Sequence, residues 1–333
     1  MSTPKELVIS PEVMATLSDS AHRWIAICMG TGCTSSASAE LRQALRQELD
    51  TYDLNGQVEV RRTGCFGFCA QGPIMIVYPD ETFYTHAKPE DAKSIVEEHI
   101  LGGQRVDRLL YRDLANDTAV EKWKDIGFFS RQQRVLLSNS GIVDPENIDH
   151  YLAREGYVAL YKTLNEMTPD QVIEVITQSE LRGRGGGGFP AGVKWGLARK
   201  TQRWPTYVIC NADEGDPGAF MDRSVLEGDP HSVIEGMIIA GYAIGAQAGY
   251  IYCRAEYPLA IQRLQIALAQ ARARGLLGQD ILGSAFSFEI LVMDGAGAFG
   301  GGEEPAWMGS RQGDRGLPWA RPRDPAVAGL GGR

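Results

Sequence analysis

Two pairs of cysteines near the start of the chain constrain its fold more than any other feature of the sequence. Cys28 and Cys33 are spaced C-x4-C, and Cys65 and Cys69 are spaced C-x3-C. Each pair follows an apolar run that predicts a strand, and each lies in a glycine-rich loop. A 2Fe-2S cluster needs four thiolates on a concave surface, and glycines let loop N–H groups approach the sulfurs. We therefore expect these four cysteines to bind a 2Fe-2S cluster.

Zinc and two disulfides are the alternatives for the same cysteines. Structural zinc sites usually space their cysteine pairs as C-x2-C, which neither pair shows. The N-terminus has no signal-peptide pattern, so we expect a cytoplasmic, reducing location, which disfavours disulfides. A net charge of -9 argues against a nucleic-acid or anionic-membrane surface. Cys210 and Cys253 end apolar runs far from the two pairs, and we expect buried thiols without a redox role.

Residues 20–103 have the pattern of a small α/β domain. Leucines at 41, 45 and 49 among charged residues predict an amphipathic helix over 38–49. Apolar runs predict strands, and Pro89 opens a closing helix; the strands are expected at 24–27, 58–60, 74–78 and 82–86, and the helix at 89–100. This order predicts a thioredoxin-like 2Fe-2S ferredoxin domain over 20–103, followed by a polar connector over 104–130.

The second domain is predicted over 131–310. Strands alternate with helices along it, which implies a mainly parallel sheet and a Rossmann-like α/β fold; the strands are expected at 207–210, 250–253 and 288–293, and the helices at 145–155, 168–181, 231–244 and 259–274. The most apolar window, 233–252, is interrupted by Glu235, Gln247 and glycines, so it predicts no membrane span. Residues 311–333 are rich in Gly, Pro and Arg and are expected to be irregular.

A glycine run at 182–195 is the strongest functional signal of the second domain. Gly183, Gly185 and Gly188 formally satisfy G-x-G-x-x-G, but a run this rich in glycine matches that pattern almost automatically. An ordinary Rossmann loop also follows a strand, whereas this run follows a predicted helix. The ordinary Rossmann interpretation is therefore rejected.

The glycine run still predicts contacts with phosphates. Backbone without side chains can close on phosphates and ring faces, and a helix starting at Gly192 would direct its positive end at an anion. Lys194 would add a counter-charge. A flexible linker is the alternative, and it is disfavoured by residues that linkers rarely contain, namely Phe189, Pro190 and Trp195.

Polar residues follow the predicted strand at 207–210. Ligands of open α/β sheets bind beyond the carboxyl ends of the strands, so Asn211 and Asp213 are placed to hydrogen-bond a flavin edge or a ribose or ribitol hydroxyl. A capped turn is the alternative for this segment. A third segment, 295–304, again places glycines and carboxylates after a strand.

Three segments, 183–195, 209–222 and 295–304, resemble the flavin-binding 51 kDa-type subunit of respiratory complex I, the NADH-quinone oxidoreductase, and its soluble relatives. With the fused ferredoxin domain, the layout is similar to the beta subunits of NAD(P)-linked iron hydrogenases and NAD-dependent formate dehydrogenases. The resemblance implies that the second domain holds FMN and NAD(H) in one cavity.

The resemblance also implies roles for individual residues. Phe189 would stack against the NADH adenine, and Asp216 stands where the family usually has a glutamate near the NADH ribose. Glu303 and Glu304 match a Gly-Glu-Glu segment beside flavin and nicotinamide, which makes Glu304 the expected catalytic residue. The remaining implied contacts to FMN or NADH come from Gly183, Arg184, Gly185, Gly186, Gly187, Gly188, Lys194, Asn211, Asp213 and Glu214.

The implied function is that of an NAD(P)H dehydrogenase subunit. Hydride would pass between NAD(P)H and FMN, and single electrons would continue to iron–sulfur clusters of a larger redox complex, of the hydrogenase, formate dehydrogenase or quinone-reducing type. The complex would be cytoplasmic or peripheral to a membrane.

The resemblance weakens towards the end of the sequence. Gly300 and Gly301 replace an apolar residue and a cysteine of the family, and Asp324 replaces an aromatic residue. The family continues into a 4Fe-4S domain, whereas no cysteine follows Cys253 here, so we expect a C-terminal truncation. The alternative function is therefore a 2Fe-2S electron-carrier module beside an incomplete, inactive flavin domain.

Overall fold

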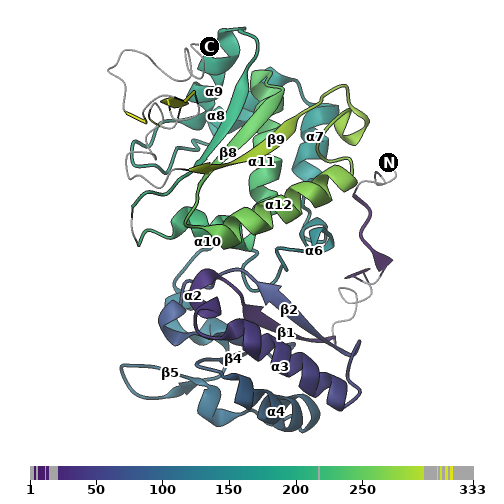
Figure 1. Cartoon of the computed structure of the whole chain (residues 1–333), viewed down its shortest axis with the longest axis vertical. Helices are drawn as coiled ribbons and strands as arrows, with labels where there is room; N and C mark the ends of the chain where they lie inside the picture. The colour runs from purple at the N-terminus through teal and green to yellow at the C-terminus, as the bar shows by residue number, and fades with distance from the viewer. Residues whose placement is uncertain are drawn as a thin grey trace. The chain divides into compact units, whose positions relative to one another are not determined.

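The computed structural model of the chain is shown in Figure 1. It describes residues 22–216 and 218–295, together with residues 4, 7–11, 13–14, 306, 308–309, 312–313 and 316–317. The chain forms two compact units. The cysteine unit consists of Ile9–Ala153 and Glu227–Asp229, and the glycine-loop unit contains Arg154–Leu226 and the chain from Pro230.

The cysteine unit is built on a four-stranded sheet of order β2-β1-β3-β4. β1 (Arg23–Cys28) pairs in parallel with β2 (Val58–Thr63). β3 (Met75–Tyr78) is antiparallel to both β1 and β4 (Thr82–Tyr84). The four predicted strands are therefore confirmed, and β2 and β4 are the sheet edges.

Helices cover one face of this sheet. α3 (Ser38–Thr51) packs beside α4 (Ala92–Ser94), which a 3-10 turn (Pro89–Asp91) precedes and a π-helical stretch (Ile95–Leu101) follows. The predicted leucine stripe of α3 forms the contact with the sheet and with the helical stretch after α4, because all of these residues are buried in one core. This core contains Leu41, Leu45, Leu49, Ile95, Val96, Ile25, Ile27 and Met75. Short α2 (Thr31–Thr34) precedes α3 and was not predicted.

Residues 104–130 contain more structure than the predicted polar connector. They form β5 (Tyr111–Arg112), β6 (Ala119–Val120) and α5 (Gly127–Ser130), with 3-10 turns at Asp107–Leu109 and Trp123–Asp125. Their apolar side chains cover the second face of the sheet, where Tyr111, Ile126 and Phe129 pack with Phe83 and Ile76. The segment therefore supplies part of the core that lies beneath the cysteine loops.

The glycine-loop unit contains a wholly parallel sheet of order β7-β8-β9. Its strands are β7 (Tyr207–Ala212), β8 (Ala248–Arg254) and β9 (Glu289–Gly295). Helices alternate with them as predicted, and the confirmed ones are α8 (Pro169–Gln178), α9 (Ala191–Lys200), α11 (Pro230–Ile244) and α12 (Pro258–Ala273). Among the described residues, none of the helices is both long and apolar enough to cross a membrane.

Three helical segments differ from the sequence-based prediction. α7 (Val158–Glu166) and α10 (Met221–Gly228) were not predicted, and the helix expected over 145–155 is shorter, as α6 (Ile148–Leu152). A 3-10 turn at Ile281–Gly283 precedes β9.

Two glycines allow α11 to lie close to the sheet. A Cβ on Gly241 of α11 would stand 2.6 Å from the Phe288 ring, and one on Gly249 of β8 would stand 3.0 Å from the same ring. Phe288 is 1% exposed, so it fills the space that these two glycines leave. Any larger residue at Gly241 would push α11 away from the sheet.

A buried histidine joins three helical elements of the glycine-loop unit. His231 of α11 accepts a hydrogen bond at Nδ1 from the Tyr157 hydroxyl (2.8 Å) and donates from Nε2 to Oε1 of Gln270 on α12 (3.0 Å). Burial lowers the pKa of His231 to about 4, although the bond to Gln270 acts in the opposite direction. The folded unit therefore holds a neutral imidazole.

We expect acid to destabilise this unit through His231. The unfolded chain protonates the histidine near pH 6.5, whereas the folded chain does so only near pH 4. The contribution of neutral His231 to the free energy of unfolding is therefore fully present above about pH 6.5. It is lost as the pH drops towards 4, by about 3 kcal/mol in total. Urea unfolding at several pH values measures this slope. His231→Asn should flatten it, whereas the exposed His86→Asn should not; equal slopes in both variants would contradict the assignment.

Candidate functional site

The structure brings the four predicted cluster cysteines together. Cys28 ends β1 and Cys33 lies in α2, whereas Cys65 follows β2 and Cys69 begins a 3-10 helix (Cys69–Gln71). The Sγ atoms of Cys65 and Cys69 are 3.7 Å apart, and the Gly67 N–H donates to Cys65 Sγ at 3.2 Å. All six cysteines are free thiols.

The thiols of both pairs interact with one another. The pKa of Cys28 is raised, first by its hydrogen bond with Cys33 and further by burial, although its bond with Cys65 lowers it. The pKa of Cys65 is raised to about 11, and its bond with Cys28 is the largest cause. Thiols with raised pKa values, such as Cys28 and Cys65, resist deprotonation until a cation compensates the charge of the thiolate. Among the described residues, no three His, Cys, Asp or Glu side chains lie close enough together to hold one metal ion.

Glycines at three positions let backbone lie close to the cysteine side chains. A Cβ on Gly32 would stand 3.0 Å from Cys69 Sγ, and one on Gly72 would stand 2.9 Å from Cys33 Sγ. A Cβ on Gly30 would lie 3.1 Å from Cys65 Cβ. This is the close approach that the sequence predicted, and it fits a cluster whose sulfurs accept hydrogen bonds from backbone N–H groups.

The four cysteines differ in their exposure to solvent. Cys28 and Cys33 are each 1% exposed, whereas Cys69 is exposed and Cys65 is intermediate. The side of the four cysteines at Cys69 is therefore the one least covered by protein.

The predicted phosphate-binding glycines form a closed loop at the start of α9. Arg182 and Pro190 make an antiparallel bridge, and the Gly183 N–H donates to the Phe189 carbonyl at 2.9 Å. Cβ atoms built on Gly185, Gly186, Gly187 and Gly188 would meet nothing within 4 Å. Gly186 has φ +101, a conformation that favours glycine. The loop is thus a ring of accessible backbone, which fits the binding of a phosphate or a ring face.

α9 is held close to α8 directly behind this loop. A Cβ on Gly192 would stand 2.2 Å from Thr177 Oγ1 of α8, so the two helices touch there. Pro190 is the N-cap and supplies no side-chain hydrogen bond, while the Ala191 N–H donates to the Leu181 carbonyl at 2.8 Å. Lys194 lies in the first turns of α9, as predicted, and the Phe189 side chain is 50% exposed, which leaves it accessible to a ligand.

Asp213 lies at the carboxyl edge of the parallel sheet, directly after β7. The residue is 1% exposed, and its Oδ1 atom is buried with no hydrogen-bond partner among the described residues. Burial raises the pKa of Asp213, although Arg254 at the end of β8 lowers it. A Cβ on Gly295, which ends β9, would stand 2.6 Å from Asp213 Oδ1. The ends of all three strands thus meet around an acceptor that a bound hydroxyl or ring N–H could satisfy.

Glu214 has a structural task that the sequence did not reveal. Its carboxylate accepts hydrogen bonds from the first N–H groups of α10, namely those of Met221, Asp222 (3.0 Å) and Arg223 (3.0 Å). Tyr257 donates its hydroxyl to the same carboxylate at 3.1 Å. Glu214 therefore caps α10 beside the candidate flavin site.

Arg254, Asp222 and Tyr257 were not among the predicted site residues. Arg254 donates to the Glu214 carbonyl at 2.6 Å, and burial, together with Glu214, raises the pKa of Asp222 to about 6. Arg254 ends β8, directly after the strand's apolar residues, and from that position it was recognisable in the sequence. Asp222 and Tyr257 gave no such signal, because only the folded chain places them beside Glu214.

The other predicted residues differ in how they lie. Asn211 accepts the Asp213 N–H at 3.3 Å, and Asp216 is exposed. Arg184 donates to the Arg182 carbonyl within the glycine loop. Glu303 and Glu304 lie outside the described residues, so their predicted roles beside flavin and nicotinamide stay predictions.

The two remaining cysteines were predicted to be buried thiols without a redox role, and the structure confirms the burial for Cys253 only. Cys253 is fully buried and Cys210 is intermediate, and they lie on the neighbouring strands β8 and β7. Burial raises the pKa of each thiol to about 12.

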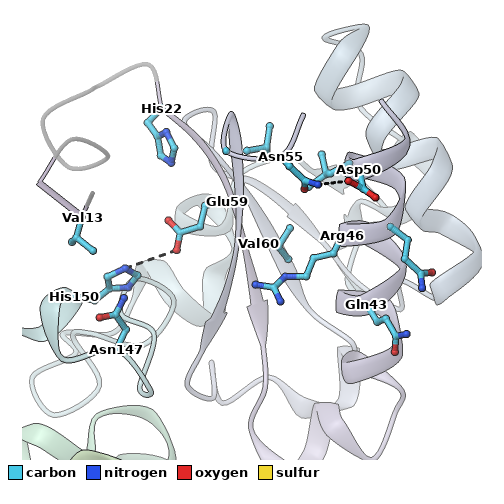
Figure 2. Close-up of a pocket in the computed structure, with 14 residues that line it drawn as sticks. Val13, His22, Gln43, Arg46, Asp50, Asn55, Glu59, Val60, Asn147 and His150 are labelled. Atoms are coloured by element: carbon cyan, nitrogen blue, oxygen red, sulfur yellow. Dashed lines mark hydrogen bonds and ion pairs between the residues drawn. The ribbon is translucent and has the colours of Figure 1, made fainter. Parts of the chain in front are cut away.

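A cleft of about 940 Å³, lined by both polar and apolar residues, opens beside β2 (Figure 2). Glu59 lies there between Arg61, whose Nε and Nη2 donate at 3.0 and 2.6 Å, and His150, whose Nε2 is 3.8 Å away. Burial raises the pKa of Glu59, but Arg61 and then His150 bring it below its ordinary value. None of the four cluster cysteines lines the cleft, and we assign it no redox role.

Two family models match the sequence. The model of the thioredoxin-like [2Fe-2S] ferredoxin matches residues 13–99, and the model of the Nuo51 FMN-binding domain matches residues 176–330. The chain joins a thioredoxin-like [2Fe-2S] ferredoxin domain to a Nuo51 FMN-binding domain. The predicted family, fold class and cofactor types are thereby confirmed.

Individual relatives agree with this assignment. The chain is 55% identical over 199 residues to the NADP-reducing hydrogenase subunit HndC of Solidesulfovibrio fructosivorans, a match that covers 60% of this chain and 40% of that protein. It is 35% identical over 298 residues to the NAD-reducing hydrogenase HoxS subunit alpha of Cupriavidus necator, covering 88% of this chain and 47% of that one. The chain thus spans about half or less of these curated relatives.

One solved structure resembles most of the chain. The NAD+-reducing [NiFe]-hydrogenase in the H2-reduced state matches with a TM-score of 0.50 and 25% identity, covering 96% of this chain and 52% of that one. The match extends across both domain types.

Replacing Glu214 tests whether its carboxylate stabilises the chain by capping α10. Glu214→Ala should lower the free energy of unfolding by about 1–2 kcal/mol, because three N–H groups of α10 lose their acceptor. Glu214→Gln keeps an acceptor oxygen and should lose less. Glu256→Ala removes an exposed carboxylate that pairs with Arg254 and should change little. Urea unfolding of the full chain measures all three, and equal losses for Glu214→Ala and Glu256→Ala would refute the capping role.

Proposed function

We propose that the chain is the NAD(P)H-oxidising part of a redox enzyme, in which electrons pass from a nicotinamide through FMN to a 2Fe-2S cluster. The observation that carries the proposal is the presence, in one chain, of a four-thiol group and an FMN-binding domain with an unsatisfied acceptor at its sheet edge. The reverse reaction, reduction of NAD(P)+, uses the same residues.

The residues of the glycine-loop unit would bind and orient the cofactors. The open backbone of Gly185 to Gly188 would face phosphate or ring groups, and α9 would add the positive end of a helix. Asp213 would accept a hydrogen bond from FMN through its free Oδ1. FMN, when bound, accepts a hydride and releases electrons one at a time.

The cysteine unit would supply the one-electron carrier. Cys28, Cys33, Cys65 and Cys69 would hold the cluster, and the exposed side at Cys69 would face the next donor or acceptor. Phe189 would pack on the nucleotide, and Glu303 and Glu304 would lie beside flavin and nicotinamide, with Glu304 as the catalytic residue.

The proposed assembly is a larger redox complex. The relatives are subunits of hydrogenases and of NADH-quinone oxidoreductases, so we propose partner subunits that carry further iron–sulfur centres. We also propose a cytoplasmic location, free or at the surface of a membrane complex.

The proposal predicts flavin reduction by nicotinamide. The full chain, reconstituted with iron, sulfide and FMN, should show flavin absorbance that bleaches anaerobically on addition of NADH or NADPH. A 2Fe-2S spectrum should persist, and an EPR signal should develop on reduction. Failure to bind FMN after reconstitution would refute the flavin function.

Matched cysteine variants separate the two cofactors. Cys65→Ala removes a cluster ligand and should abolish the cluster spectrum while leaving flavin bleaching intact, whereas Cys210→Ala should leave the cluster unchanged. A chain with a normal cluster but no bleaching by either nucleotide would be the electron-carrier module with an inactive flavin domain.

A further inference from the structure

A carboxylate far along the sequence contacts the first cysteine loop. Glu227 is 1% exposed and belongs to the cysteine unit. Its Oε2 accepts the Thr31 N–H at 3.0 Å, and its Oε1 accepts the Thr31 hydroxyl. Thr31 lies between the two cysteines of the first pair, so Glu227 holds the backbone from which Cys33 projects.

The same segment touches the second cysteine loop. A Cβ on Gly30 would stand 3.5 Å from Glu227 Oε2 and 3.1 Å from Cys65 Cβ, which places the carboxylate close to both pairs. A Cβ on Gly64, next to Cys65, would stand 2.4 Å from the Gly228 backbone. Glu227 and Gly228 are therefore packed against both loops.

We propose that Glu227 is a positioning residue of the 2Fe-2S site and also sets its reduction potential. By accepting two hydrogen bonds from Thr31, it fixes the loop between Cys28 and Cys33. Because it is buried, its negative charge is weakly screened and opposes the arrival of an electron at the neighbouring sulfurs. The inference rests on the 2Fe-2S assignment of the proposed function.

Glutamine at this position separates charge from geometry. In Glu227→Gln the amide oxygen can still accept the Thr31 N–H, while the amide N–H2 donates to the Thr31 hydroxyl, which can act as an acceptor. Both hydrogen bonds to Thr31 remain while the negative charge is removed. Glu227→Ala removes both.

The control is a carboxylate in the same unit but away from the cysteines. Glu59 pairs with Trp24 in the sheet register, whereas Thr63 pairs with Cys28. Along β2, Glu59 therefore lies four residues, or roughly 13 Å, from Thr63, the residue that pairs with Cys28. Glu59→Gln therefore removes the same charge farther from the cluster.

The test is a redox titration of the reconstituted full chain followed by EPR. Glu227→Gln should shift the equilibrium between oxidised and reduced cluster about tenfold towards the reduced form. This raises the one-electron reduction potential by about 59 mV, with unchanged cluster content and EPR line shape. Glu59→Gln should move it much less. Glu227→Ala should lower the cluster content and speed hydrogen exchange at the Thr31 amide. A potential for Glu227→Gln equal to that of the wild type would overturn the proposal.

A second variant guards against a purely structural effect. Thr31→Val keeps the Glu227 charge and removes the hydroxyl that stabilises it, so the potential should stay at or below the wild-type value. If Thr31→Val raised the potential as much as Glu227→Gln, loop distortion would be the cause and the role of the charge would be refuted. A wild-type chain that assembles no cluster would instead refute the 2Fe-2S function itself.

Discussion

Capping of short helices by glutamate side chains from outside the helix is the interaction on which both candidate sites depend. α2 and α7 receive no side-chain hydrogen bond from their own N-cap residues, and glutamates from elsewhere in the chain accept their first N–H groups. Glu227 does this for α2, Glu235 for α7 through the N–H groups of Tyr157 (2.8 Å) and Leu160 (3.0 Å), and Glu214 for α10. A carboxylate at a helix N-terminus satisfies orphan donors and interacts favourably with the helix dipole. Glu227, far along the chain, therefore positions α2, which carries Cys33, and Glu214, next to Asp213, is fixed by the start of α10 and by Tyr257.

These contacts explain which helices the sequence predicted. α3 was predictable from its leucine spacing, and α8 from its Thr168 cap, whose capping box with Gln171 is present in the structure. α2, α7 and α10 were missed because their capping groups lie elsewhere in the chain and their own residues show no strong local start. The core role of residues 104–130 was missed for a related reason. Tyr111, Ile126 and Phe129 are scattered among polar residues, and only the fold gathers them on one face of the sheet.

The same distinction applies to the sites. The cluster cysteines were predictable because their spacing and neighbouring glycines are local, and the structure shows why glycine is needed at positions 30, 32 and 72. Asp213 was predictable because it follows an apolar strand. Asp222 and Tyr257 became recognisable only when folding placed them beside Glu214, and Glu227 only when the chain returned to the first cysteine loop.

The two sites also differ in what the protein alone leaves unsatisfied. At the cluster site, hydrogen bonds between neighbouring cysteines raise the pKa of Cys28 and Cys65. The four thiolates that a cluster needs would therefore have to be stabilised by the positive charge of the metal. At the flavin site, a buried acceptor of Asp213 has no partner among the described residues, and leaving such an atom unpaired costs about 1–3 kcal/mol. A ligand that supplies the missing donor recovers that energy on binding. Elsewhere in the unit, the His231 contacts, the Glu235 cap and the packing of Phe288 join the helices and the sheet. The scaffold is thus stabilised by groups outside the site, and the groups inside it remain available for the cofactor.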